Sequence, residues 1–164
     1  MVKIEDSIGN LQLRDCSDLP LCAKSGVFEI YPDVTNKIDV YCDMDTNGGG
    51  WTIVQRRFDD SVDFFRYWND YKNGFGSVAG NHWLGNGFEV NNGMKFTTRD
   101  RDNDLHPYHC GRGQQGAWWY NKCGITSLNG RYEPEGTTGA KMIQWKTWRN
   151  TTMRATAMKI RPMN

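Results

Sequence analysis

The chain has 164 residues, a length typical of one compact domain, and 38% of them are hydrophobic, which argues against a disordered chain. Its 20 lysines and arginines against 19 aspartates and glutamates give a formal net charge of +1, so no bulk field attracts nucleic acid or anionic lipid. No run approaches the roughly 18 apolar residues of a membrane span, and residues 1–7 lack the apolar stretch of a signal peptide. We therefore expect neither a general nucleic-acid binder nor membrane insertion.

Three short strands are predicted in the first third of the chain. Residues 26–31 and 38–42 alternate polar and apolar side chains, with turn residues between them. After three consecutive glycines at 48–50, a β-branched and aromatic run at 51–55 predicts the third strand. A final strand is predicted within residues 155–161, and the many Gly, Asn and Asp residues between these runs indicate a loop-rich fold.

One helix is predicted after the third strand. Four aromatic residues follow the i, i+3, i+4, i+7 spacing of a helix face: Phe64, Tyr67, Trp68 and Tyr71. Ser61 or Asp63 can cap its start, and Asn73–Gly74 supplies a left-handed stop. This stripe is expected to pack on a sheet and to have no ligand role.

The five cysteines form no C-x-x-C pair, so neither a zinc ribbon nor a thioredoxin-like redox motif is indicated. They are Cys16, Cys22, Cys42, Cys110 and Cys123. Disulfides in an oxidising compartment fit this pattern better. The odd number leaves one thiol unpaired, and the count alone does not determine the connectivity.

An acidic loop offers the first candidate for chemistry. Asp100–Asp104 places three carboxylates at alternate positions, and calcium prefers oxygen ligands of this kind. The loop is not an EF-hand, because Leu105 stands where that motif needs glycine and Gly111 where it needs glutamate. From the residues alone, a calcium site and a solvated acidic loop both remain open.

Other motifs carry less weight. Residues 111–116 match G-x-G-x-x-G, but no strand precedes and no helix follows them, so a dinucleotide site is not expected. His106, His109 and Cys110 match no standard zinc spacing. No nucleophile with its base is visible, which argues against an enzyme. Asn150 begins an N-glycosylation acceptor, which matters only in a secreted chain.

Motifs along nearly the whole chain after Leu13 follow the order found in one known family. They include residues 40–44, 48–52, 71–76, 92–96, 100–104, 118–121 and 158–162. In these motifs the chain resembles the C-terminal globular domain of fibrinogen. The resemblance implies an α+β fold over residues 14–164, with small antiparallel sheets, few short helices and a loop-rich calcium and ligand subdomain. Residues 1–13 would be an N-terminal extension.

The resemblance also implies disulfides and a metal site. Cys16 would pair with Cys42 and Cys110 with Cys123, which leaves Cys22 unpaired. A calcium ion would be held by the side chains of Asp102 and Asp104 and by the backbone carbonyls of His106 and Tyr108.

The implied ligand pocket lies next to the loop between Cys110 and Cys123. Its residues would be Lys122, Cys123, Gly124, Gln114 and Ala140, and the Lys122–Cys123 peptide would be cis. The chain departs from acetyl-binding members, which have histidine where Gly124 stands and aromatic walls where Gln114, Gly139 and Thr151 stand. Weak or absent binding of N-acetylated sugars is therefore expected.

The chain is also shorter than its family between Asn86 and Asn92, where members carry a long segment of the central sheet. A sheet that loses central strands exposes edges or apolar surface, so low stability and association into a homo-oligomer are expected.

The resemblance implies a secreted, extracellular recognition module without catalytic activity. The leading interpretation is a lectin-like innate recognition module that binds glycan or acetylated ligands at a calcium-stabilised pocket. The alternative is a matrix or signalling module that binds a protein receptor, as tenascin-like and angiopoietin-like members do, and the missing pocket aromatics favour it.

Overall fold

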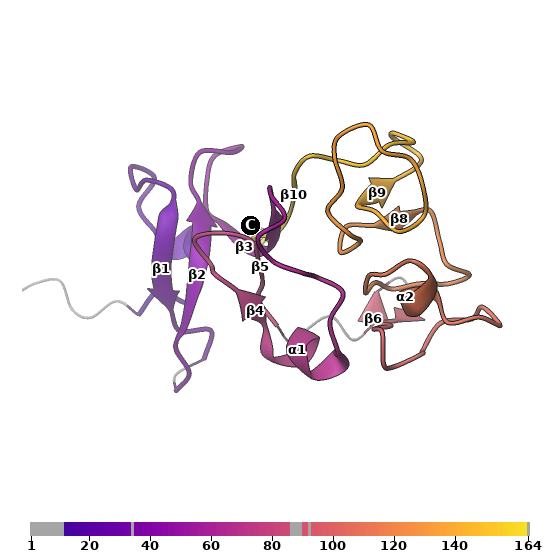
Figure 1. Cartoon of the computed structure of the whole chain (residues 1–164). Coiled ribbons are helices and arrows are strands. Elements are labelled where there is room, and N and C mark those ends of the chain that lie inside the picture. The colour runs from indigo at the N-terminus through magenta and orange to yellow at the C-terminus, as the bar shows by residue number, and fades with distance from the viewer. Residues whose placement is uncertain (1–11, 34, 86–89, 92, 164) are drawn as a thin grey trace, which may run out of the picture. The chain divides into compact units, whose positions relative to one another are not determined.

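The computed structural model describes residues 12–33, 35–85, 90–91 and 93–163 (Figure 1). Of the predicted extension over 1–13, only residues 12 and 13 are therefore described, and most of the predicted joint at 86–92 also lies outside the described residues. The chain divides into two compact units, Met1–Ile53 with Lys159–Asn164 and Val54–Met158.

The first unit is built on the predicted strands. Strands β1 (Gly26–Ile30) and β2 (Ile38–Asp43) form an antiparallel hairpin, and β2 pairs with the start of β3 (Trp51–Arg57). Val40 and Cys42 are fully buried on the same face of β2, as the period of two predicts. Before the hairpin lies a 3-10 turn, η1 (Cys16–Asp18), whose start is capped by the carboxylate of Asp15.

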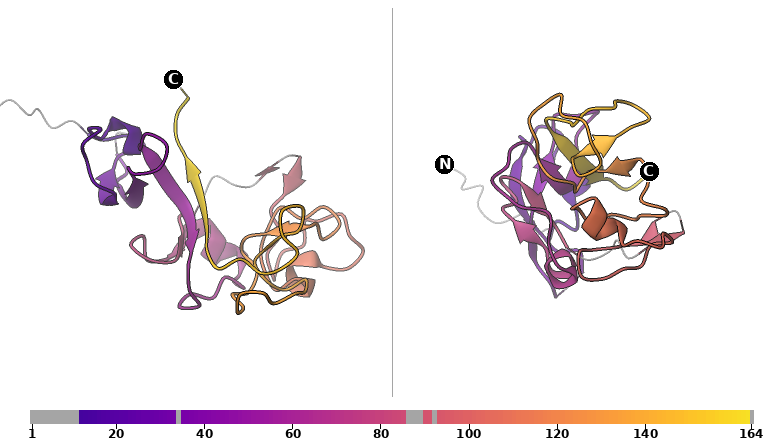
Figure 2. Two further views of the ribbon diagram at one scale, coloured as in Figure 1. Left: turned by 90° about the horizontal axis from the view of Figure 1, so that it is seen from above. Right: turned by 45° about the vertical axis from the view of Figure 1, so that its right-hand side comes forward.

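The second unit joins short strands through long loops (Figure 2). In this unit β3 pairs with β5 (His82–Trp83), β5 pairs with β4 (Phe75–Gly76), and β10 (Thr156–Ile160) pairs with β3. Two further antiparallel pairs are β6 (Val90–Asn91) with β7 (Met94–Lys95) and β8 (Thr126–Ser127) with β9 (Gln144–Trp145). The helices among the described residues of this unit are α1 (Trp68–Asn73) and α2 (Cys110–Gly113). This is the predicted α+β fold of small antiparallel sheets and few short helices.

An aromatic cluster forms the main core of the second unit. Its buried members are Phe64, Tyr71, Trp83, Phe96, Ala117 and Trp119. The Tyr71 ring lies 5.2 Å from Trp83 and 5.1 Å from Phe96, between centroids, in tilted or edge-on geometry. Such pairs add about 0.5 to 1.5 kcal/mol beyond the burial of their area. A smaller cluster of Leu128, Ile143 and Met153 lies under the second half of the unit.

The predicted helix is real but begins later than its aromatic pattern indicates. α1 starts at Trp68, and the residues before it are extended. Phe64 is buried in the core while Tyr67 is 52% exposed, so the four aromatics do not share one face. Asp63 caps the N–H of Phe65 and not the helix. The helix ends as predicted, at Gly74 with φ of +82°. None of the helices in the described part of the chain is long and apolar enough to cross a membrane.

Candidate calcium loop and ligand pocket

Asp104 lies at the centre of the acidic loop of the second unit. One of its carboxylate oxygens accepts the N–H of His106 at 3.0 Å, and the other accepts the N–H of Cys110 at 2.9 Å. The N–H of Leu105 donates to the carbonyl of Asn121 at 2.8 Å, which ties the loop to the segment before Cys123. These bonds fold the predicted calcium residues into one compact turn.

The two predicted carboxylate ligands lie close together. The N–H of Asp104 donates to the carboxylate of Asp102 at 3.3 Å, and ligand atoms of Asp102, Asp104 and His109 all lie within 4.8 Å of one another. Burial raises the pKa of Asp104, and the neighbouring Asp102 raises it further, against the lowering effect of the two N–H donors. Two crowded carboxylates of this kind fit a bound cation, which would relieve their repulsion.

The predicted carbonyl ligands belong to the same turn. Nδ1 of His106 lies 3.1 Å from both the N–H and the carbonyl oxygen of Tyr108. In the neutral tautomer that accepts this N–H, the nitrogen cannot also donate to the carbonyl. The carbonyl of Tyr108 therefore remains available as an oxygen ligand, and the residues fit the ion that the resemblance implies.

The structure contains the two disulfides that the resemblance implies. Cys16–Cys42 and Cys110–Cys123 are bonded, with Cα atoms 5.5 Å and 4.9 Å apart, and Cys22 is exposed and unpaired. Because the sulfur of Cys110 is used in this bond, the zinc set of His106, His109 and Cys110 has no thiolate to offer. Cys110 instead serves as a disulfide partner, as the resemblance implies.

The expectation of a cis peptide at Lys122–Cys123 is wrong. All peptide bonds among the described residues are trans. Cys123 and Gly124 instead take φ of +63° and +61°. Two successive left-handed residues turn the chain at this point, so the turn does not need a non-proline cis bond that costs about 3 to 4 kcal/mol.

Gln114 is a buried link between segments and does not line an open pocket. Its amide nitrogen donates to the carbonyl of Cys123, and its amide oxygen accepts from Nε2 of Gln144 at 2.8 Å. Nε2 of Gln144 also lies 3.4 Å from the carbonyl of Ala140. Both glutamine side chains are buried. The structure thus brings together three predicted ligand residues, Gln114, Cys123 and Ala140. Gln144 links them, and no local sequence pattern singles out this residue.

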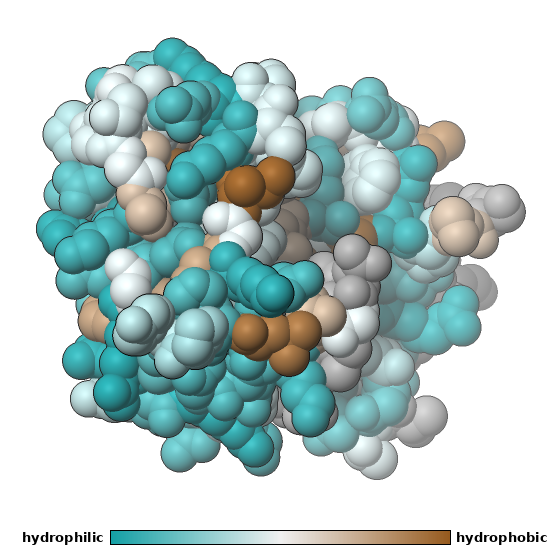
Figure 3. All heavy atoms as spheres, turned by 90° about the vertical axis from the view of Figure 1, so that its right-hand side faces the viewer, coloured by the Kyte–Doolittle hydropathy of each residue, from teal (hydrophilic) through white to brown (hydrophobic). Residues whose placement is uncertain are grey.

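Lys122 and Gly124 lie outside this buried link and are exposed. Gly124 borders an open pocket of about 300 Å³, together with Trp118, Asn121 and Ile125. On the side of the molecule that carries α2, β8 and β9, hydrophobic residues form small separate areas in a mostly hydrophilic surface (Figure 3). Asn150 is exposed, and its glycosylation stays a prediction.

The first unit has a larger pocket, about 580 Å³, beside its glycine loop. Asn47 and the three glycines that follow it all have positive φ, and a Cβ on Gly49 would lie 2.8 Å from the carbonyl oxygen of Met44. Only glycine fits the turn at Gly49, because both its φ and the nearby backbone exclude a side chain.

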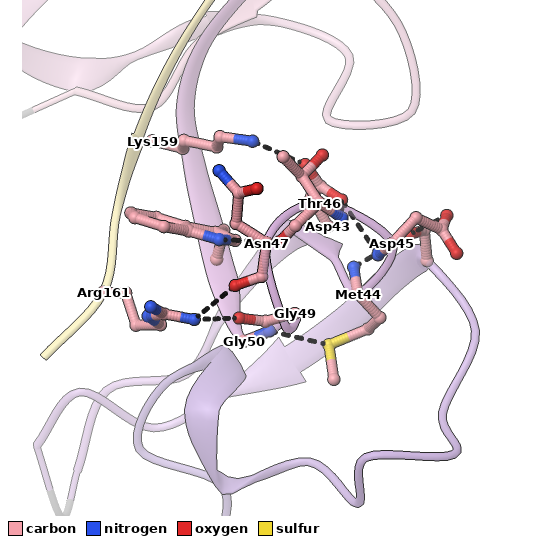
Figure 4. A network of polar contacts seen from close by, with 11 residues as sticks. Asp43, Met44, Asp45, Thr46, Asn47, Gly49, Gly50, Lys159 and Arg161 are labelled. Atoms are coloured by element: carbon pink, nitrogen blue, oxygen red, sulfur yellow. Dashed lines mark hydrogen bonds and ion pairs between the residues drawn. The ribbon is translucent and has the colours of Figure 1, made fainter. Parts of the chain in front are cut away.

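Two basic residues that come late in the chain contact this loop (Figure 4). Nη1 of Arg161 donates to the carbonyls of Asn47 at 3.1 Å and Gly49 at 2.9 Å, and its guanidinium lies 4.4 Å from the centre of the Trp51 ring. Nζ of Lys159 donates to the carboxylate of Asp43 at 2.9 Å. Arg161 satisfies two loop carbonyls and Lys159 pairs with a carboxylate at the end of β2, so we assign both residues a structural role.

The fold and the disulfide-closed loop define a fibrinogen-like globular domain. The family of fibrinogen beta and gamma chains, C-terminal globular domain, matches residues 12–88 and 87–163, and the chain belongs to this family.

Similarity to individual proteins supports the same family assignment. The chain is 34% identical to Angiopoietin-2 of Bos taurus over 212 residues, covering 91% of this chain and 43% of that protein. It is 31% identical to Fibrinogen C domain-containing protein 1 of Xenopus tropicalis, covering 91% and 47%. The fibrinogen-like globe domain of human ANGPTL6 superposes with a TM-score of 0.84 and 26% identity, covering 98% and 99%. The chain thus spans less than half the length of the curated relatives it matches.

Proposed function

We propose that this chain is an extracellular, non-enzymatic module that recognises a protein receptor. Its similarity to Angiopoietin-2 and to the globe domain of ANGPTL6 supports this interpretation over the lectin-like one. Its two disulfides suit a secreted protein, since such bonds persist in oxidising compartments.

The observation that carries the proposal is the buried pair of Gln114 and Gln144. An acetyl group needs an apolar wall and a placed polar group. Here the amide of Gln114 fills the position beside the Cys123 carbonyl, and Gly139 is exposed and offers no wall. A small acetylated ligand therefore has little to bind.

A protein surface is available on the β8–β9 pair instead. Ile125 is 51% exposed, Trp145 45% and Trp148 72%. Thr126 pairs with Trp145, and the N–H of Lys146 donates to the carbonyl of Ile125, so one small sheet holds Ile125 and Trp145 together. Exposed tryptophans of this kind are enriched at the centres of protein interfaces.

The test is a paired screen against a glycan array and an array of cell-surface receptor ectodomains, each with and without calcium. We expect binding to an ectodomain that falls at least tenfold in Trp148→Ala and is unchanged in Leu21→Ala, an exposed apolar control in the first unit. Micromolar calcium-dependent binding to N-acetylglucosamine, with no ectodomain bound, would instead establish the lectin-like interpretation.

We also propose that the acidic loop binds calcium through the carboxylates of Asp102 and Asp104 and the carbonyls of His106 and Tyr108. A bound cation would hold this turn rigid beside the Cys110–Cys123 disulfide. Calcium should raise the melting temperature because it binds the folded chain and not the unfolded one. Asp102→Ala with Asp104→Ala should abolish that gain, while Asp39→Ala, at an exposed aspartate of β2, should preserve it. An unchanged melting curve on adding chelator and then calcium would contradict the proposal.

A further inference from the structure

A second pocket of the second unit, about 360 Å³, combines two arginines with two aromatic rings. It is lined by Phe65, Tyr67, Arg99, Asp100 and Arg112. The guanidinium of Arg99 lies 4.4 Å from the centre of the Phe65 ring and 4.6 Å from that of Tyr67. The pocket's volume falls within the range of about 300 to 1,000 Å³ that is typical of small-molecule sites.

Hydrogen bonds to the backbone hold both arginines in place. Nη1 of Arg99 donates to the carbonyl of Phe65 at 3.3 Å, and Nε of Arg112 donates to the carbonyl of Arg99 at 2.8 Å. The remaining guanidinium nitrogens of both residues have no hydrogen-bond partner in the described part of the chain. Each guanidinium is therefore held in position before a ligand binds, and its remaining N–H groups are free to donate to that ligand.

Neither arginine forms an ion pair with any described residue, whereas other arginines of this unit do. Arg131 pairs with Glu133 at 3.2 Å, and Arg149 pairs with Glu135 at 3.4 Å. Placing two guanidiniums around one pocket without a paired carboxylate has an electrostatic cost, because like charges repel. An anionic ligand would remove that cost.

Asp100 is the one acidic residue that lines the pocket, and its carboxylate is already engaged. One oxygen accepts the Thr98 hydroxyl at 2.7 Å and the N–H of Trp68 at 2.8 Å. Partial burial opposes the effect of these bonds, but together they lower the pKa of Asp100, so the group stays ionised. The lining residues therefore carry one excess positive charge.

We propose that this pocket binds an acidic saccharide. The sulfate or carboxylate group would accept from Arg99 and Arg112, since a planar guanidinium matches the geometry of both oxyanions. The half-exposed ring of Tyr67 offers an apolar face for the sugar. This site goes beyond the proposed receptor binding and shares no residue with the surface at Trp148.

The experiment is titration calorimetry with a heparin-derived hexasaccharide, performed on the wild type and on single variants. Arg99→Gln and Arg112→Gln should each weaken binding about tenfold. Arg154→Gln is the matched control, because it removes the same charge from an exposed arginine of this unit. It should change affinity by less than about twofold. Arg99→Lys keeps the charge but loses the planar fork, so it should behave like Arg99→Gln.

Two further ligands identify the chemistry. A desulfated hexasaccharide that binds as well as the sulfated one assigns the carboxylate, and loss of binding on desulfation assigns the sulfate. Equal affinities for wild type, Arg99→Gln and Arg112→Gln would overturn the proposal, as would equal binding of a neutral chitin hexasaccharide or tighter binding of a phosphopeptide. Melting curves of the Arg112→Gln variant check that it folds. Ectodomain binding is measured separately at Trp148, so either proposal can fail without the other.

Discussion

Gly130 occupies a position in the second unit where no side chain fits. A Cβ at this residue would overlap the carbonyl oxygen of Met142, across the bridge between Arg131 and Met142. Gly130→Ala should therefore lower the free energy of unfolding by about 2 kcal/mol or more, because backbone atoms cannot move aside cheaply.

Gly113→Ala provides the matched control, because nothing lies within 4 Å of its added Cβ. That substitution should be neutral or slightly stabilising, by less than about 1 kcal/mol. Urea unfolding of both variants measures the difference. Equal stabilities would show that the backbone around Gly130 can open at little cost.

Asp43 should make the first unit sensitive to acid. Partial burial opposes the effect, but the ammonium of Lys159 and the N–H groups of Thr46 and Asp45 lower the pKa of Asp43. A pKa below the unfolded value of about 3.9 stabilises the folded chain above that value, and this contribution is lost as the pH falls through the lowered pKa. We therefore expect stability to fall below about pH 4.

Asp43→Asn should lower stability at pH 7 by roughly 1 to 2 kcal/mol and reduce this acid sensitivity. Asp39→Asn, at an exposed aspartate of the same strand, should change neither. Thermal unfolding between pH 3 and pH 7 measures both effects. An unchanged acid response in Asp43→Asn would assign the response to other carboxylates.

At the scale of elements, the Cys110–Cys123 disulfide should stabilise both the fold of the second unit and the acidic loop beside it. It closes a loop with a sequence separation of 13 residues, for which loop entropy gives about 3 kcal/mol. Replacing both cysteines by serine should lower the melting temperature and, because Asp104 accepts from the N–H of Cys110, should also weaken the calcium response. Cys22→Ser is the control and should change neither. Non-reducing peptide mapping that found Cys22 in a bridge would contradict this assignment.

The elements also show what the sequence can and cannot predict. Strands 26–30 and 38–43 follow from alternation, because each buries mainly one face. Strand 51–57 is buried along most of its length and is marked instead by its β-branched and aromatic run. The start of α1 could not be predicted from its aromatic spacing, because Phe64 reaches the core from an extended segment before the helix. The start of α1 is held locally by the carboxylate of Asp70, which accepts the N–H of Tyr67, and from a distance by the carboxylate of Asp100, which accepts the N–H of Trp68.

Some features of the candidate site could likewise be predicted from the sequence, and others could not. The disulfide pairing and the carboxylates of Asp102 and Asp104 follow from the resemblance to the family, whatever their sequence separation. The link between Gln114 and Gln144 joins residues 30 positions apart and depends on how the loops pack. No local period or motif marks such a pair. Only the structure shows that the two glutamine side chains occupy the expected pocket.

At the scale of the whole molecule, we expect the isolated chain to self-associate. Its alignment with Angiopoietin-2 extends over 212 residues although this chain has 164, and the two family matches meet at residues 87–88. Both observations support a shortened central sheet, which would expose edges or apolar surface. Sedimentation velocity should show concentration-dependent species, and a hydrophobic dye should bind. A monodisperse monomer with a sharp thermal transition and no dye uptake would show that the sheet has closed.

The first unit combines residues up to Ile53 with residues from Lys159 onward, and this has a consequence for biosynthesis. The Cys16–Cys42 bond can form early, but Lys159 and Arg161 reach Asp43 and the glycine loop only after the entire second unit has been made. Until then the carbonyls of Asn47 and Gly49 lack the Arg161 guanidinium that donates to them in the complete fold. A nascent chain that stops before Lys159 lacks these contacts, so a product truncated there should be less stable than the full chain.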